Sequence, residues 1–81
     1  MYKVIYNYEF FEPFEYEVLN AEFKGSSLEV YNGRVIRKIN LNTLKNDRPL
    51  LTSVVIRDGR GNALDGRIIH EGGSIERGGW R

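Results

Sequence analysis

The sequence contains no cysteine, and this absence excludes several kinds of chemistry. Without thiols the protein forms no disulfide bond, no thiolate zinc site and no redox motif. We therefore expect a cytoplasmic protein that is stabilised by packing alone. A chain of 81 residues buries only about 60% of the surface that its unfolded form exposes. Residues 1–81 are accordingly interpreted as one small domain of modest stability.

Histidine and long apolar runs are also scarce. His70 is the only histidine, which excludes a histidine-rich metal site. No apolar run approaches the roughly 20 residues that a membrane-spanning helix needs. The first residues lead directly into a strand pattern, without the features of a signal peptide. We expect no membrane contact, no bound metal and no cofactor.

The remaining polar residues offer only weak catalytic or metal-binding patterns. Ser74, His70 and Asp65 are the types of a hydrolase triad, but nothing marks Ser74 as a nucleophile. Asp58, Asn62 and Asp65 supply oxygen ligands for calcium, but their spacing departs from the alternate positions of a calcium loop. Side chains of this type commonly hold a loop through turns of their own. We therefore predict that the protein is not an enzyme.

What the sequence does contain is a dense β-branched stretch at residues 50–70. Two apolar runs flank a loop that is rich in glycine, aspartate and asparagine, which is typical of a strand, a turn and a returning strand. We predict that this hairpin lies at the centre of the sheet, with Val54, Ile56 and Ile68 buried.

Alternating residues indicate further strands on both sides of this hairpin. Residues 3–10 place Val4, Tyr6, Tyr8 and Phe10 on one face. The alternation changes phase after Val18, which predicts a β-bulge or a bend where the chain turns a corner. A short helix over residues 15–23 is the alternative. Residues 42–49 are interpreted as a loop with at most one helical turn capped by Asn42, and residues 74–77 as a last short strand.

The Asn32-Gly33 pair is the clearest turn signal in the chain. Asparagine followed by glycine between apolar alternations favours a two-residue type I′ hairpin. This register pairs Tyr31 with Arg34, whose side chains would stack. It also brings Val30 and Val35 together on the core face.

These patterns predict an all-β fold of six or seven short strands. A small single-domain barrel or a curled antiparallel sheet removes exposed edges and suits this length. A two-layer β-sandwich with one short helix is the alternative.

Charge is distributed unevenly along the chain. Residues 1–31 carry six glutamates against two lysines, a net charge of −4, whereas residues 32–81 carry ten basic against five acidic residues, a net charge of +5. Cross-strand pairs that neutralise one another are one interpretation. Two separate surfaces of opposite charge are the other.

Two surfaces are candidates for binding. Residues 8–16 combine aromatic rings with glutamates around a proline, which is the composition of a protein-binding patch unless the bend at the proline buries the rings. The predicted contact residues are Phe11, Pro13, Phe14, Glu9, Glu12 and Glu15. The alternative is an arginine-rich face on a small barrel that binds single-stranded nucleic acid, formed by Arg57, Arg60, Arg67, Arg34 and Tyr31. We expect a non-enzymatic protein-binding module that acts as an adaptor, inhibitor or accessory subunit.

Overall fold

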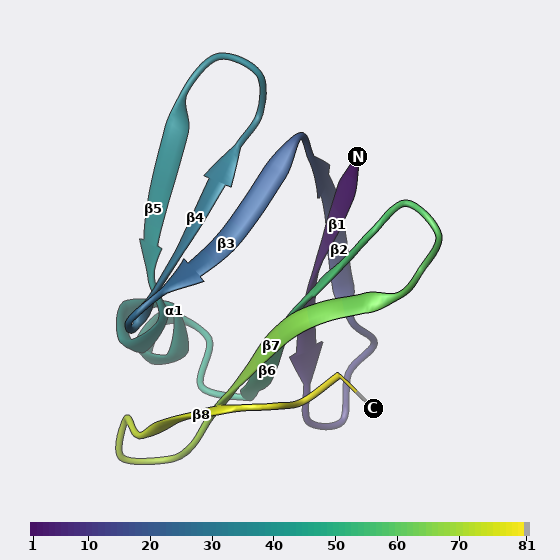
Figure 1. Cartoon of the computed structure of the whole chain (residues 1–81). Coiled ribbons are helices and arrows are strands. Elements are labelled where there is room, and N and C mark those ends of the chain that lie inside the picture. Colours follow the sequence, from purple (N-terminus) through teal and green to yellow (C-terminus); the bar gives the residue numbers. More distant parts are fainter. Residues whose placement is uncertain (81) are drawn as a thin grey trace.

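The computed structural model describes residues 1–80, which form two antiparallel sheets and one short helix (Figure 1). The larger sheet has the strand order β2-β1-β6-β7-β8, and its strands are β1 (Tyr2–Tyr8), β2 (Phe14–Val18), β6 (Leu51–Arg57), β7 (Ala63–Ile69) and β8 (Ile75–Arg77). The smaller sheet has the order β3-β4-β5, with β3 (Asn20–Lys24), β4 (Ser27–Tyr31) and β5 (Ile36–Asn40). Helix α1 (Leu41–Asp47) connects β5 to β6.

The all-β class is confirmed, but the sheets do not close into a barrel. Each sheet ends in edge strands that do not pair with the other sheet, and residues 1–80 contain eight strands, more than the six or seven predicted. The sandwich-like alternative with one short helix describes this arrangement better than the barrel does.

The core lies between the sheets, where the apolar faces of their strands meet. Val4, Val54 and Leu28 are fully buried there, and Leu41 of α1 completes the packing. The central position of the β6–β7 hairpin is confirmed, because β6 pairs with β1 on one side and with β7 on the other.

Ile68 does not lie in this core. Val54 and Ile56 are buried as expected, but Ile68 is only half-buried and pairs with Ser53. The segment Gly78–Gly79 runs across these two residues on the other face of the sheet. The core residue of β7 is Ile69, so the prediction had chosen the wrong member of an adjacent pair.

The phase change after Val18 is a corner between the two sheets. Strand β2 ends at Val18, Leu19 is exposed, and β3 begins at Asn20 in the smaller sheet. The Leu19 amide donates a hydrogen bond to the Tyr31 carbonyl at 2.8 Å, which fixes the corner to the end of β4. The bend is therefore confirmed, and the alternative helix over residues 15–23 is wrong.

The β4–β5 hairpin has a wider turn than the two-residue type. Tyr31 pairs with Ile36, so the loop spans residues 32–35. The Asn32 side chain accepts hydrogen bonds from the amides of Arg34 and Val35 at 2.9 and 3.1 Å, and of the two turn residues only Gly33 has positive φ. The side chain thus replaces the tight turn. Val30 faces Arg37 instead of Val35, and Val35 is exposed.

The helical turn predicted in residues 42–49 is present, with a different cap. Helix α1 begins at Leu41, and the Asn40 side chain accepts a hydrogen bond from the Thr43 amide at 2.9 Å. Such a bond satisfies one of the free amides at a helix start. Asn42 lies inside the first turn, so its assignment as the cap was wrong.

Candidate functional site

At the end of strand β1, the backbone forms a hydrogen bond with the segment that precedes β6. The pairing of β1 with β6 shifts in register after Asn7, and the Glu9 amide donates to the Leu50 carbonyl at 2.8 Å. The next residue, Phe10, has φ of 69° and an 85% exposed side chain. Positive φ is rare for a bulky residue and reflects a conformation held by its surroundings. The turn directs this ring into solvent, although alternation along β1 had placed it inside.

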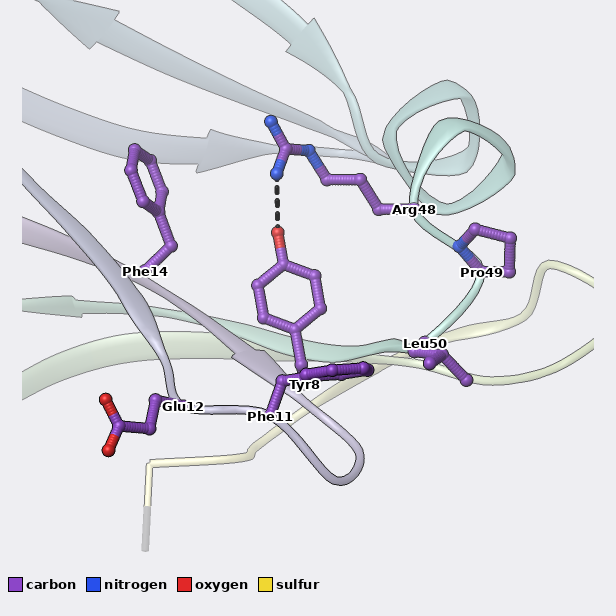
Figure 2. A pocket seen from close by; sticks show the side chains of 7 residues that line it. All are labelled: Tyr8, Phe11, Glu12, Phe14, Arg48, Pro49 and Leu50. Atoms are coloured by element: carbon purple, nitrogen blue, oxygen red, sulfur yellow. Dashed lines mark hydrogen bonds between the residues drawn. The ribbon is translucent and has the colours of Figure 1, made fainter.

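Two more phenylalanine rings beside the same turn are exposed, so the bend at the proline does not bury them. The side chains of Phe11 and Phe14 are 64% and 50% exposed. They border an open groove of about 380 Å³ between the β1–β2 turn and the segment that joins α1 to β6 (Figure 2). The turn contributes Phe11 and Glu12, the strand ends beside it contribute Tyr8 and Phe14, and the joining segment contributes Arg48, Pro49 and Leu50. We call this feature the aromatic groove.

Arg48 connects the two sides of the aromatic groove. Its guanidinium donates to the Tyr8 hydroxyl at 2.7 Å (Figure 2). It also lies 5.7 Å from the ring centre of Tyr6 and 6.0 Å from that of Phe14. Within about 6 Å, a cation is attracted to the face of an aromatic ring. No ion pair joins Arg48 to an acidic side chain of residues 1–80, so these rings and the hydroxyl are the side-chain partners of this exposed guanidinium.

Phe14 of the groove packs against two tyrosine rings of β1 and β2. The rings of Tyr6, Phe14 and Tyr16 lie 5.4 to 5.8 Å apart in tilted or edge-on orientations. The hydroxyls of Tyr6 and Tyr16 are hydrogen-bonded at 2.8 Å. Burial, with the Tyr6 contact, raises the pKa of Tyr16 well above its usual range, so this hydroxyl stays neutral. Phe14 packs on the hydrogen-bonded pair Tyr6–Tyr16, and it continues the core-facing side of β2 to the protein surface.

The acidic residues that we expected around this patch lie on two sides of the sheet. Glu9 and Glu12 are exposed at the turn, as is Pro13, and Glu12 borders the aromatic groove. Glu15 pairs with Ile5 on the opposite face of β2 and forms an ion pair with Lys3 at 3.4 Å. Of these three glutamates only Glu12 lines the groove, and Glu9 is exposed in the neighbouring turn.

The arginines of the nucleic-acid alternative are not gathered on one face. Arg57 uses its guanidinium within the fold, donating to the carbonyls of Gly61 and Trp80 at 2.9 and 3.1 Å. Arg60 is exposed in the β6–β7 loop. Arg34 and Tyr31 belong to the β4–β5 hairpin, in the other sheet.

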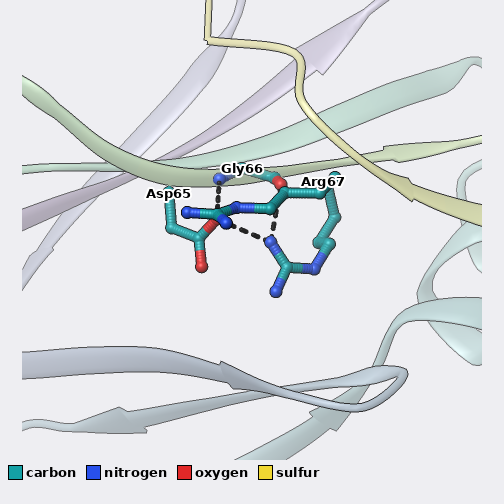
Figure 3. Close-up of polar contacts among 4 residues, drawn as sticks. Asp65, Gly66 and Arg67 are labelled. Atoms are coloured by element: carbon teal, nitrogen blue, oxygen red, sulfur yellow. Dashed lines mark hydrogen bonds and ion pairs between the residues drawn. The ribbon is translucent and has the colours of Figure 1, made fainter.

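Arg67 faces the space between the sheets. It forms an ion pair with Asp65 at 2.6 Å, shown in Figure 3, and lies 4.6 Å above the ring of Phe23. Burial raises the pKa of Asp65, but hydrogen bonds from Arg67, the Gly66 amide and Arg77 outweigh it and hold the pKa below the ordinary value. Arg67 is thus a structural cation, with 18% of its side chain exposed.

The residues of the possible hydrolase triad and of the possible calcium loop form other contacts in the structure. His70 contacts Glu76 at 3.0 Å, and Asp58 accepts hydrogen bonds from the amides of Arg60 and Asn62 within its own loop. Nowhere in residues 1–80 do three histidine, cysteine, aspartate or glutamate side chains come together as a metal site would require. The one helix in this part of the chain is too short and too polar to cross a membrane.

Sequence reasoning missed four residues that line the groove: Tyr8, Arg48, Pro49 and Leu50. Alternation placed Tyr8 on the core face, where it packs in part, and also placed the exposed Phe10 there, because alternation cannot show where β1 ends. Arg48 and Leu50 lie in a polar stretch with no pattern of its own. The only local signal that could have pointed to Arg48 and Leu50 was their position directly before the strand that begins at Leu51.

Comparison of the chain with protein-family models, with curated proteins and with solved structures finds no match.

Proposed function

We propose that this protein is a non-enzymatic, cytoplasmic binding module whose aromatic groove holds an apolar segment of a protein partner. The observation that carries the proposal is the exposure of Phe10, Phe11 and Phe14 on one turn, beside a groove with a preformed arginine–tyrosine bridge. Exposed aromatic rings with arginine nearby are characteristic of the residues that dominate binding energy in protein interfaces. An adaptor, an inhibitor or an accessory subunit needs no further chemistry than this.

The charges at the groove define what a partner has to offer. Glu9 and Glu12 are exposed, and neither forms an ion pair with any residue of 1–80. A partner with an apolar anchor and a basic border complements them, since unlike charges across an interface favour association. Arg48 already lies against the rings and the Tyr8 hydroxyl, so it shapes the groove without requiring an acid from the partner.

A capture experiment with matched variants tests this function. Tagged wild-type protein and the variants Phe11→Ala, Phe14→Ala and Leu64→Ala are used to capture proteins from cells of the source organism. Leu64 is 50% exposed on β7, outside the groove, so Leu64→Ala controls for the general loss of apolar surface. We expect Phe11→Ala and Phe14→Ala to lose a partner that Leu64→Ala retains, by about tenfold or more in affinity.

Folding is checked by the urea midpoint of each variant. A partner captured equally by all four proteins contradicts the groove, whatever the identity of that partner. Titration with a single-stranded oligonucleotide at low and moderate salt tests the competing class, because binding to phosphates weakens steeply as salt increases. Binding that disappears with salt, together with no partner lost by the groove variants, would favour the arginine alternative.

A further inference from the structure

We propose that the partner of the aromatic groove is the β4–β5 hairpin of a second copy of this chain, in a head-to-tail contact. This inference rests on the proposed function, because it assigns an occupant to the same groove. It is drawn from a second exposed apolar surface, whose charges unpaired within residues 1–80 are basic where those of Glu12 at the groove and Glu9 in the neighbouring turn are acidic.

The tip of the β4–β5 hairpin exposes apolar side chains that have no cover. Val35 and Ile36 are 56% and 67% exposed, and the neighbouring Tyr31 is 38% exposed. The two hydrogen bonds to the Asn32 side chain and the glycine at position 33 hold the loop in one shape. A preformed loop loses little conformational freedom on binding, which suits it to insertion into a groove.

Several charged side chains near the hairpin tip and near the aromatic groove form no ion pairs within residues 1–80. Arg34 lies in the hairpin loop, Arg37 and Lys38 follow in β5, and all three are exposed. None of them forms an ion pair with an acidic residue of 1–80, and neither Glu12 at the groove nor Glu9 in the neighbouring turn pairs with a basic residue of the same range. The ion-paired glutamates are Glu15, Glu22, Glu29, Glu71 and Glu76, and Glu17 on β2 is the remaining glutamate of residues 1–80 without such a pair. The hairpin tip therefore has the apolar centre and basic border that the groove requires.

The two surfaces lie at opposite ends of the molecule. In Figure 1 the β4–β5 loop is at the top of the view and the turn between β1 and β2 is at the bottom. The longest extent of the chain is 33 Å. A copy in this conformation cannot place its own hairpin in its own groove, so the contact joins two different surfaces of two copies. Such a contact produces open chains or closed rings, according to the rotation that it imposes.

Sedimentation velocity of the purified chain, as a function of concentration and salt, tests the proposal. We expect the average mass of the wild-type protein to rise with concentration and to rise less at higher salt. Ile36→Glu removes the hairpin surface and Phe14→Ala removes the groove surface, and each variant alone should remain monomeric. Val35→Glu and Phe11→Ala are second variants of each kind, in case one of the first pair unfolds. Leu64→Ala should associate like the wild type.

The decisive measurement mixes the two kinds of variant. Ile36→Glu retains an intact groove and Phe14→Ala retains an intact hairpin, so an equal mixture should form one-to-one dimers that grow no further. A mixture that stays monomeric while the wild type associates overturns the head-to-tail contact. A wild-type chain that is monomeric at low salt and at its highest soluble concentration overturns self-association altogether. If the groove variants still lose a captured partner in that case, the proposed function stands with a different protein as partner.

Discussion

The guanidinium of Arg48 and the hydroxyl of Tyr8 are 2.7 Å apart, although 40 positions separate the two residues in the sequence. This hydrogen bond joins the end of β1 to the segment that follows α1. The adjacent backbone bond from Glu9 to Leu50, at 2.8 Å, joins the same two segments. The two bonds together fix the relative position of the two sides of the aromatic groove, where we propose that a partner binds.

The first prediction concerns this bridge. Arg48→Met keeps an apolar chain of similar length and Tyr8→Phe keeps the ring, so each removes one end of the hydrogen bond. We expect each change to lower the free energy of unfolding by about 1 kcal/mol, the usual net value of such a bond. A double-mutant cycle in urea should give a coupling energy of about 0.5–1 kcal/mol. Strictly additive effects would show that the two side chains do not act together.

The second prediction concerns the core. Val54 is fully buried in β6, so Val54→Ala removes packed methyl groups and leaves a cavity. We expect a loss of about 1–3 kcal/mol, a large fraction of the roughly 5 kcal/mol expected of so small a domain. The urea midpoint measures this loss. Leu64→Ala on the neighbouring strand is the control and should shift the midpoint far less.

The third prediction concerns acid stability. Because the pKa of Asp65 is lower in the folded chain than its ordinary value, ionised Asp65 stabilises the fold above the unfolded pKa of about 3.9. That contribution is lost as the pH falls through the folded pKa. Asp65→Asn should therefore destabilise the protein at pH 7 and flatten the decline of its stability below about pH 4.

Asp47→Asn is the control for this measurement. Asp47 is exposed and forms no ion pair with a residue of 1–80. Urea unfolding between pH 2 and pH 7 compares the two variants with the wild type. If the free energy of unfolding falls equally steeply at low pH in all three proteins, a stabilising role for ionised Asp65 is contradicted.

The fourth prediction concerns the start of α1. The Asn40 side chain accepts the hydrogen bond from the Thr43 amide, so Asn40→Ala should cost about 1 kcal/mol. Asn42→Ala is the matched control, since the Asn42 side-chain oxygen is buried without a hydrogen-bond partner. Its removal should cost less than that of Asn40. The reverse order of urea midpoints would identify Asn42 as the functional cap.

The fifth prediction uses the only tryptophan as a reporter. A β-carbon on Gly66 would lie 2.5 Å from the Gly78 carbonyl oxygen and 3.1 Å from the Trp80 ring. Gly66→Ala should therefore displace the segment 78–80 from the sheet and shift the emission of Trp80 to longer wavelength. Leu64→Ala in the same strand should leave that emission unchanged. An identical spectrum for Gly66→Ala would show that this segment does not pack on β7.

The sequence by itself determined where the strands lie. Two β-branched apolar runs around a glycine-rich loop located the hairpin of β6 and β7, and a change in the phase of alternation located the corner at Leu19. Both signals are local, because β-branched residues favour strands and a strand places successive side chains on opposite faces. The same local pattern exposed the problem of the adjacent rings Phe10 and Phe11, which cannot both point inward from one regular strand.

Only the tertiary structure decided which of two adjacent residues is buried and which segments meet. Ile69, and not Ile68, faces the core, and the segment Gly78–Gly79 lies against Ile68 on the other face of β7. The turn of β4 and β5 is wide because a side chain of the loop bonds to its own amides. The aromatic groove combines Phe14 with Arg48, residues with no relation along the sequence. Its shape depends on packing and hydrogen bonds between distant segments, and no local pattern of residues carries that information.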